Sequence, residues 1–275
     1  MNESAYEPQP APAFGIALNE LTLGDPFRWL AAGWRDFMRA PAIGLFYGAS
    51  FALMGGLLLK AFQDAPAWVL ALSAGFLLVG PFLCVGMYDV SRRLECGERP
   101  DLRQSLTAWS TRTGTMAIFG AVLLVLEMVW ARASLVVFAL TFDGMPDFNG
   151  SIARLLDPEN LGFIVAYVGV GGVFAALIYS VSVVSLPMIL DRQTDAITAG
   201  LTSIRLCLAQ TGVMLLWGTL ITLLVVIAML PGFLGLLVVG PVLGHASWHA
   251  YRAAVAAETV PAAAAPKPAL EPIRK

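Results

Sequence analysis

The sequence predicts an all-α, polytopic membrane helix bundle of six transmembrane helices. We expect three pseudo-repeated hairpins, each with a juxtamembrane amphipathic helix. The first observation is composition: of 275 residues, 58% are hydrophobic and 13% charged, whereas about a quarter are charged in soluble proteins. The second is a set of long apolar runs, and the third is a short phrase that recurs near the ends of three of them. Lipid offers no hydrogen-bond partner to the backbone, so such runs form helices.

Six apolar runs approach or exceed the length of about 20 residues that a bilayer requires of a helix. In chain order they are Ala42–Phe62, Ala67–Tyr88, Thr115–Thr141, Leu161–Leu190, Gly212–Leu230 and Gly232–Trp248. The patterns Gly44-x-x-x-Gly48 and Gly240-x-x-x-Gly244, and the run 169–172, predict close helix approach.

A short amphipathic helix is expected before each hairpin. Asp25 is the predicted N-cap of the first and Pro26 its opening residue, while Asp101 and Asp195 precede the second and third. The first helix spaces Phe27, Leu30, Ala31, Trp34 and Met38 along one face, away from Arg28, Arg35 and Arg39. Such helices favour interfacial anchoring over the alternative, a docking surface for a cytoplasmic partner.

The recurring phrase closes the second helix of each predicted hairpin. One copy has Gly80-Pro81-Phe82-Leu83, Tyr88-Asp89 and Arg92, and another has Gly240-Pro241-Val242-Leu243, Trp248-His249 and Arg252. A weaker copy contains Leu186-Pro187 and Asp191-Arg192. The repeat prolines Pro81, Pro187 and Pro241 are expected to bend these helices at comparable depth. Asp89, Asp191, His245 and His249 are the predicted polar positions at the helix ends.

This full-length pattern, from an Asp-Pro-led amphipathic segment through six spans, resembles an integral membrane family of bacteria. That family is catalogued as domain of unknown function 2189, and the resemblance covers residues 14–255. It implies a multi-pass protein of the bacterial inner membrane without an established activity. Residues 1–13 and 256–275 are expected to be disordered tails, because both are rich in Ala, Pro or charge.

Basic residues predict the orientation. Fourteen Lys and Arg side chains fall on the side that holds both termini, and Lys60 and Arg154 fall on the other. Cytoplasmic loops carry the excess of Lys and Arg, so both termini are expected in the cytoplasm.

Glu127 is the most informative single residue, because it lies near the middle of the third apolar run. A charge at that depth costs at least a few kcal/mol, so such residues face a bundle interior. Two interpretations stay open: a functional intramembrane acid, or a structural one bonded to Tyr167, Tyr179 or Ser180 of the fourth run.

Two histidines are too few for a haem–copper oxidase. His245 and His249 lie four residues apart, and a metal would need further ligands, so we expect no metal and no cofactor. The arginines follow the membrane edges, so no nucleic-acid partner is expected either. No catalytic residue is predicted, and an enzyme is the less favoured class.

Three functions remain. The first is a non-enzymatic scaffold or assembly partner in the lipid bilayer, bound to another membrane protein or to itself. The second is a small-molecule or lipid carrier that uses Glu127. A continuous polar cavity reaching that residue would favour the carrier, and a tightly filled interior would favour the scaffold. The third is a respiratory redox-associated protein.

Overall fold

The structure is a computed structural model that describes residues 15–64, 69–141, 158–192 and 194–256. The described part is all-helical apart from an isolated bridge between Leu18 and Val255. Its helices are α1 (Asp25–Arg39), α2 (Pro41–Asp64), α3 (Val69–Glu95), α4 (Leu102–Thr107), the 3-10 helix η3 (Ala108–Arg112), α5 (Thr113–Thr141), the 3-10 helix η4 (Pro158–Asn160), α7 (Leu161–Ser182), α8 (Ser185–Asp191), α9 (Ala196–Ala209), α10 (Thr211–Met229) and α11 (Leu236–Ala254).

Four stretches of the described chain are long and apolar enough to cross a membrane: Pro41–Asp64, Leu102–Thr141, Pro158–Asp191 and Thr211–Met229. The other two predicted spans correspond to α3 and α11. Both of these helices end in polar segments, with Arg92 and Arg93 in the last turn of α3 and Arg252 in that of α11. The structure therefore supports four spans, and the count of six stays a prediction.

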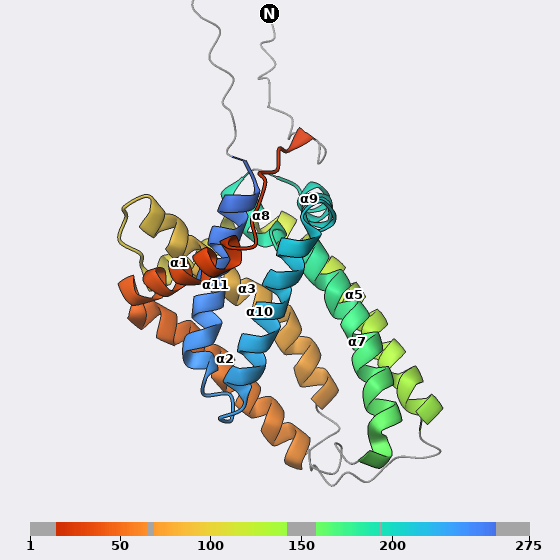
Figure 1. The fold of residues 1–275 in the computed structure, drawn as a ribbon. Helices are drawn as coiled ribbons and strands as arrows, with labels where there is room; N and C mark the ends of the chain where they lie inside the picture. Colours follow the sequence, from red (N-terminus) through yellow and green to blue (C-terminus); the bar gives the residue numbers. More distant parts are fainter. Residues whose placement is uncertain (1–14, 65–68, 142–157, 193, 257–275) are drawn as a thin grey trace, which may run out of the picture.

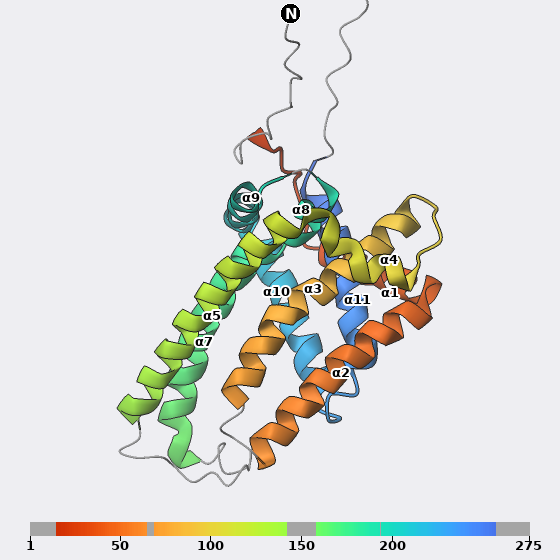
Figure 2. The same cartoon turned by 180° about the vertical axis from the view of Figure 1, so that it is seen from behind.

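The helices divide into a closed region and an open region. In the closed region α11 packs against α1, α2 and α3. In the open region α5 and α7 lie side by side and diverge from α2 and α10, away from the end of the bundle where α8 lies (Figures 1 and 2). The predicted tails 1–13 and 256–275, except for Ala256, and the basic residue Arg154 lie outside the described residues. Ala256 donates its N–H to the Ala17 carbonyl.

Glycines allow the close packing of the closed region. A Cβ on Gly48 would lie 2.1 Å from the backbone oxygen of Leu237, and one on Gly33 would lie 2.5 Å from that of Val242. These distances bring the backbones of α2 and α1 against α11. The two Gly-x-x-x-Gly patterns accordingly lie in packed surfaces, against Phe37 (Gly44), Leu237 (Gly48), Phe51 (Gly240) and Met87 (Gly244).

The glycine run 169–172 does not lie in a closely packed surface. A Cβ on Gly169 or Gly172 would meet no atom within 4 Å, and one on Gly171 would make an ordinary contact with Trp130. The prediction of close approach is wrong here, because α7 has the single long neighbour α5 along this stretch and leaves these glycines on its open faces.

Two of the three predicted helix starts are confirmed. The Asp101 side chain accepts a hydrogen bond from the Gln104 N–H, and the Asp195 side chain accepts from the N–H groups of Ile197 and Thr198. Asp25 is not the N-cap of α1: it is the first helical residue, and its carboxylate accepts from the backbone and hydroxyl of Thr22. The nearby Thr22 donors capture the carboxylate that was expected to cap the helix.

The fourth apolar run is not one helix. It breaks at Val183 and Val184 into α7 and α8, and Pro187 lies in the first turn of α8. Proline is tolerated in a first turn, where its missing N–H would have no helical partner, but it disrupts a helix interior. Pro81 and Pro241 lie inside α3 and α11.

Candidate functional site

A cavity of about 400 Å³ lies where the open region meets the rest of the bundle. Seven helices contribute to its wall: α2, α3, α5, α7, α8, α10 and α11. The lining is mainly apolar, and its residues are Phe51, Phe76, Gly80, Pro81, Cys84, Tyr88, Leu123, Leu124, Glu127, Ile178, Tyr179, Ser182, Val183, Leu186, Ile221 and Ser247. Its volume falls within the range of about 300–1,000 Å³ that is typical of small-molecule pockets.

Glu127 is the only carboxylate among the residues that line this cavity. It lies at the centre of α5 and is 9% exposed. The hydroxyl of Tyr179 donates to the Met214 carbonyl, and that of Ser180 donates to the Ala176 carbonyl. Neither hydroxyl is hydrogen-bonded to Glu127 in the described residues, so the predicted bonds from Glu127 to Tyr179 and Ser180 are not found. No hydrogen bond joins Tyr167 to Glu127 in the part of the chain that the structure describes.

The other polar groups of the cavity are largely satisfied within the protein. The hydroxyls of Ser182 and Ser247 donate to the carbonyls of Ile178 and Leu243 in their own helices. Within the described residues, no hydrogen bond to the Glu127 carboxyl is found. Glu127 is thus the wall residue with spare capacity to bind a polar group of a guest.

Proline and glycine shape the α3 side of the cavity. Pro81 lies inside α3, where it lacks the N–H that would bond the preceding turn. The preceding residue, Gly80, has no side chain, and a Cβ there would meet no atom within 4 Å. At Gly80 the helix therefore presents backbone to the cavity, while Phe76, Cys84 and Tyr88 of α3 contribute side chains to the same wall.

A polar network closes the end of the bundle next to this cavity. His249 Nε2 lies 2.7 Å from Asp36 Oδ2 of α1, and His245 Nδ1 lies 2.8 Å from the Ser91 hydroxyl of α3. Asp36, Ser91 and His245 are each at most 5% exposed. Buried polar groups need such partners, so these bonds fix α11 against α1 and α3.

The same helix also bonds to the ends of α3 and α8. Trp248 Nε1 donates to Glu95 Oε2 at 3.0 Å, and the Tyr251 hydroxyl donates to Asp191 Oδ2 at 2.7 Å. Arg252 forms ion pairs with both carboxylates, at 3.2 Å to Glu95 and 3.4 Å to Asp191. Arg252 thereby joins the ends of α3, α8 and α11.

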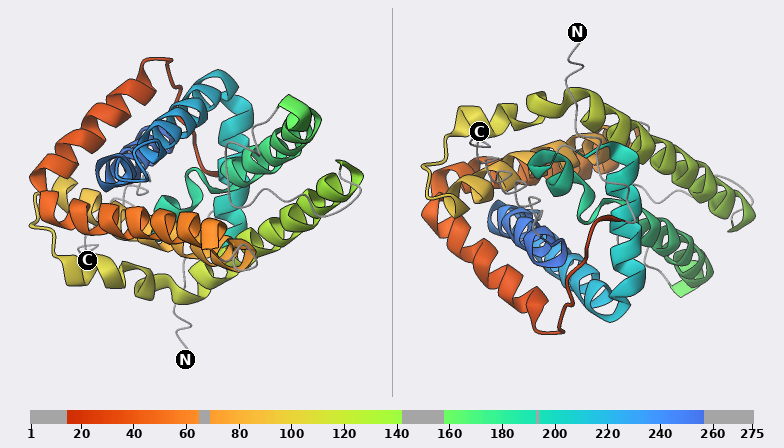
Figure 3. Two further views of the ribbon diagram at one scale, coloured as in Figure 1. Left: turned by 90° about the horizontal axis from the view of Figure 1, so that it is seen from below. Right: turned by 90° about the horizontal axis from the view of Figure 1, so that it is seen from above.

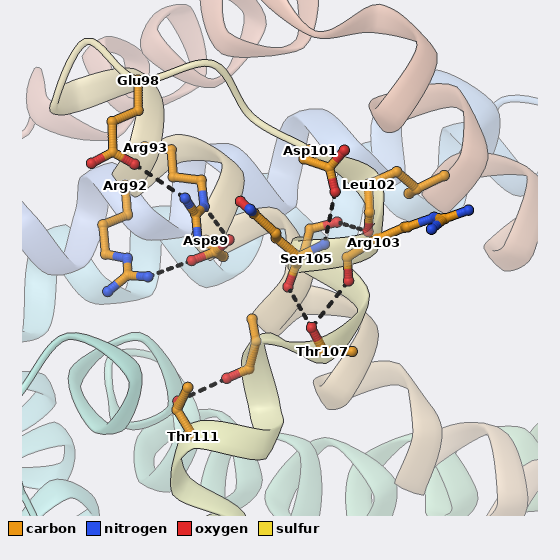
Figure 4. Close-up of polar contacts among 12 residues, drawn as sticks. Asp89, Arg92, Arg93, Glu98, Asp101, Leu102, Arg103, Ser105, Thr107 and Thr111 are labelled. Atoms are coloured by element: carbon orange, nitrogen blue, oxygen red, sulfur yellow. Dashed lines mark hydrogen bonds and ion pairs between the residues drawn. The ribbon is translucent and has the colours of Figure 1, made fainter.

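Asp89 takes a local role in this region. Its carboxylate pairs with Arg92 at 2.5 Å and Arg93 at 2.8 Å, one turn farther along α3, and Arg93 continues to Glu98 (Figure 4). Asp89 therefore holds the arginines at the end of α3. His249, which the recurring phrase sets in the equivalent position, instead bonds to another helix.

Burial and hydrogen bonding act in opposite directions on Asp36. Burial alone would raise the pKa of this carboxyl, but the hydrogen bond and positive charge of His249 outweigh it and lower the pKa below its usual 3.8. The Asp36–His249 contact is thus stabilised in the form with an ionised carboxylate.

The sequence predicts some members of the polar network but not their partners. Asp191 and His249 lie at or near the ends of α8 and α11, as predicted, and their bonds lie at the same end of the bundle. The helix-end position predicted for His245 is wrong, because the residue lies at the middle of α11. Their partners Asp36, Ser91 and Glu95 were missed, although a buried Trp or Tyr at a helix end signals that a partner exists.

Residues 69–191 match the model of the family catalogued as domain of unknown function 2189, described as a predicted integral membrane protein. The match covers less than half of the chain. The prediction made from the recurring phrase is confirmed over this range, and a bacterial origin stays a prediction. No curated protein and no solved structure matches the chain.

The family segment runs from α3 to the end of α8. It includes Glu127, Pro81 and Gly80 of the cavity, together with Asp89 and Asp191. The α1 and α11 partners of the polar network lie outside the matched residues of domain of unknown function 2189.

Proposed function

We propose that this protein binds a small hydrophobic molecule inside the membrane and acts as its carrier. The observation that carries the proposal is the cavity of about 400 Å³, whose mainly apolar wall contains Glu127. The sequence-based criterion for a carrier is a continuous polar cavity that reaches Glu127. This cavity reaches Glu127 but is mainly apolar, so it meets that criterion in part and supports a carrier of an apolar molecule.

The wall specifies the class of ligand. Apolar side chains favour an apolar body, and a carboxyl with no hydrogen bond from the described residues favours a single donor or cationic group. A hydrophobic amine meets both requirements. Acidic residues inside membrane segments commonly mark substrate or ion pathways, which fits a carrier.

The proposal includes a six-span topology in a bacterial inner membrane, organised as three pseudo-repeated hairpins. The 27 residues of α3 and the 19 of α11 correspond to roughly 40 and 28 Å of helix, close to the hydrocarbon thickness of about 30 Å. Reporter fusions after Lys60 and Leu230 should report periplasm, and a fusion after Arg99 should report cytoplasm. The reverse pattern at Arg99 would refute the topology.

Photolabelling tests the function. Long-chain amine, alcohol and carboxylic acid probes that carry the same photoreactive group would be applied to the purified protein, and the labelled peptides mapped. We expect the amine to label the cavity segments of α3 and α5 most strongly. Glu127→Gln keeps the shape of the side chain but cannot carry a charge, so it should remove the preference for amine while the fold stays intact.

Equal labelling of the cavity by all three probes in the wild type would contradict the role of Glu127. Absence of saturable labelling in the cavity would refute the carrier. Glu127→Leu is a second variant. It removes the polarity of this side chain altogether, so it should abolish labelling by the amine as well as the preference for it.

The second candidate is the scaffold or assembly partner. It is supported by the network that ties α11 to α1, α3 and α8, because interlocked helix ends hold a fixed surface. Full complementation of a deletion strain by both Glu127 variants would favour it. No observation of this kind supports the redox-associated alternative. That the purified protein contains no haem stays a prediction.

A further inference from the structure

The surface of α1 divides into three lengthwise stripes. Successive residues turn by about 100° in an α-helix. Trp29, Asp36 and Phe37 face the bundle and are at most 5% exposed. Phe27, Trp34 and Met38 share a second stripe and are 55%, 48% and 56% exposed.

The third stripe of α1 consists of arginine. Arg28, Arg35 and Arg39 are all exposed and project roughly 100° from the exposed apolar stripe. Arg28 pairs with Asp25 at 2.8 Å, and Arg39 reaches the buried Asp36 only at 4.0 Å. The apolar and basic stripes therefore lie side by side on the part of α1 that the bundle leaves uncovered.

The same division occurs in α9. Its exposed apolar residues Ile197, Leu201 and Leu208 are 71%, 45% and 75% exposed, and their spacing places them on one stripe. Ala199 and Leu206 are fully buried on another face. Arg205 lies roughly 60° from the centre of the apolar stripe and is half-buried, since it bonds the Ile16 carbonyl.

Both helices lie around the end of the bundle that holds the polar network (Figure 3). In Figure 1, α9 is seen end-on and α1 runs across the picture, whereas the long helices run along it. One residue separates the end of α1 from the start of α2, a candidate membrane span. This connection holds α1 at the boundary of the membrane.

We infer that α1 and α9 lie in the headgroup layer of one leaflet and that the arginine stripe of α1 binds the phosphates of anionic phospholipids. The apolar stripes then face the acyl chains. Three features favour lipid over a second protein copy: the aromatic and basic stripes are adjacent, α1 is tethered to a span, and the arginines match phosphate in charge.

Trp34 provides a reporter for this contact. The protein would be placed in phosphatidylcholine vesicles with a minority of phosphatidylglycerol, and either lipid would carry bromine at the same mole fraction. The Trp34 signal is the difference between the wild type and Trp34→Phe. Both brominated lipids should quench it, and the anionic one about twice as strongly, because the arginines enrich it locally.

The variant Arg28→Gln with Arg35→Gln and Arg39→Gln should bring the quenching ratio to about one. Arg99→Gln, an exposed loop position, is the matched control and should keep the preference. If the triple variant fails to fold, Arg35→Gln alone keeps the two ion pairs of α1 and should lower the ratio.

Three results would overturn the inference. They are equal quenching by the two lipids in the wild type, a preference that survives the arginine substitutions, and no quenching by either lipid. The last would place a protein, such as a second copy, over Trp34.

Discussion

The closed region and the open region use different means of holding helices together. In the closed region, Gly33 and Gly48 bring backbones into contact, and α11 adds bonds to three neighbours. In the open region, α5 and α7 pack on each other and expose apolar side chains such as Val125, Val168 and Val173, which are 59%, 64% and 70% exposed. Surfaces of that kind fit lipid.

The closed region is therefore the rigid part of the bundle, and the open region provides the space for a ligand. Close backbone contact and buried hydrogen bonds leave the helices little freedom, because a shift of a helix would break the contact or the bond. The cavity instead forms where α5 and α7 diverge from the rest, and its wall is shared by both regions. Tyr88 lines the cavity beside Asp89, and Ser247 lines it beside Trp248, so the closed region supports one wall of the site.

The largest expected effect is on the contact between α2 and α11. Gly48→Ala would place a Cβ 2.1 Å from the Leu237 oxygen, and a backbone cannot yield as a flexible side chain does. We expect a loss of about 2–3 kcal/mol or more in the free energy of unfolding, measured by denaturation in detergent. Gly56→Ala, on the same helix with no atom within 4 Å, should be neutral or stabilising by up to about 1 kcal/mol. Similar losses in both variants would contradict the packing.

A smaller effect is expected from pH at the contact between α1 and α11. The folded state lowers the pKa of Asp36 below 3.8, so an ionised Asp36 favours folding. Its contribution is fully present above the unfolded pKa and is lost as pH falls through the lowered folded pKa. At neutral pH, Asp36→Asn should cost about 1.5–3 kcal/mol.

Stability measured from neutral pH to below about pH 4 provides the test. The difference between the wild type and Asp36→Asn should shrink as the carboxyl becomes protonated. A difference that stays constant across the series would show that the charge of Asp36 does not hold α1 on α11.

Local features of the fold were predictable and long-range ones were not. Asp101 and Asp195 cap helices through N–H groups two or three residues away, so their sequence context suffices. The prediction that Asp25 is an N-cap is wrong because a competing donor, Thr22, lies just as close in sequence. The break before Pro187 follows from proline itself, although the apolar run concealed it.

The site shows the same limit. Glu127 was predictable as an interior residue, because an isolated acid in a long apolar run has few tolerable positions. The cavity around it depends on how seven helices pack, and the pairs Asp36–His249 and Ser91–His245 join residues more than 150 positions apart. No periodicity or spacing in one sequence encodes such pairs.

The measurement that tests the cavity most directly compares two glycines of α3. A Cβ on Gly80 or on Gly75 would meet no atom within 4 Å, but only Gly80 lines the cavity among the described residues. Both Gly80→Leu and Gly75→Leu should fold, and the affinity of each for the long-chain amine would be measured by competition against its photoreactive form. If the amine binds in this cavity, Gly80→Leu should weaken binding at least about tenfold, a loss of about 1.4 kcal/mol, and Gly75→Leu should leave it unchanged. Equal affinity in both variants would contradict the account.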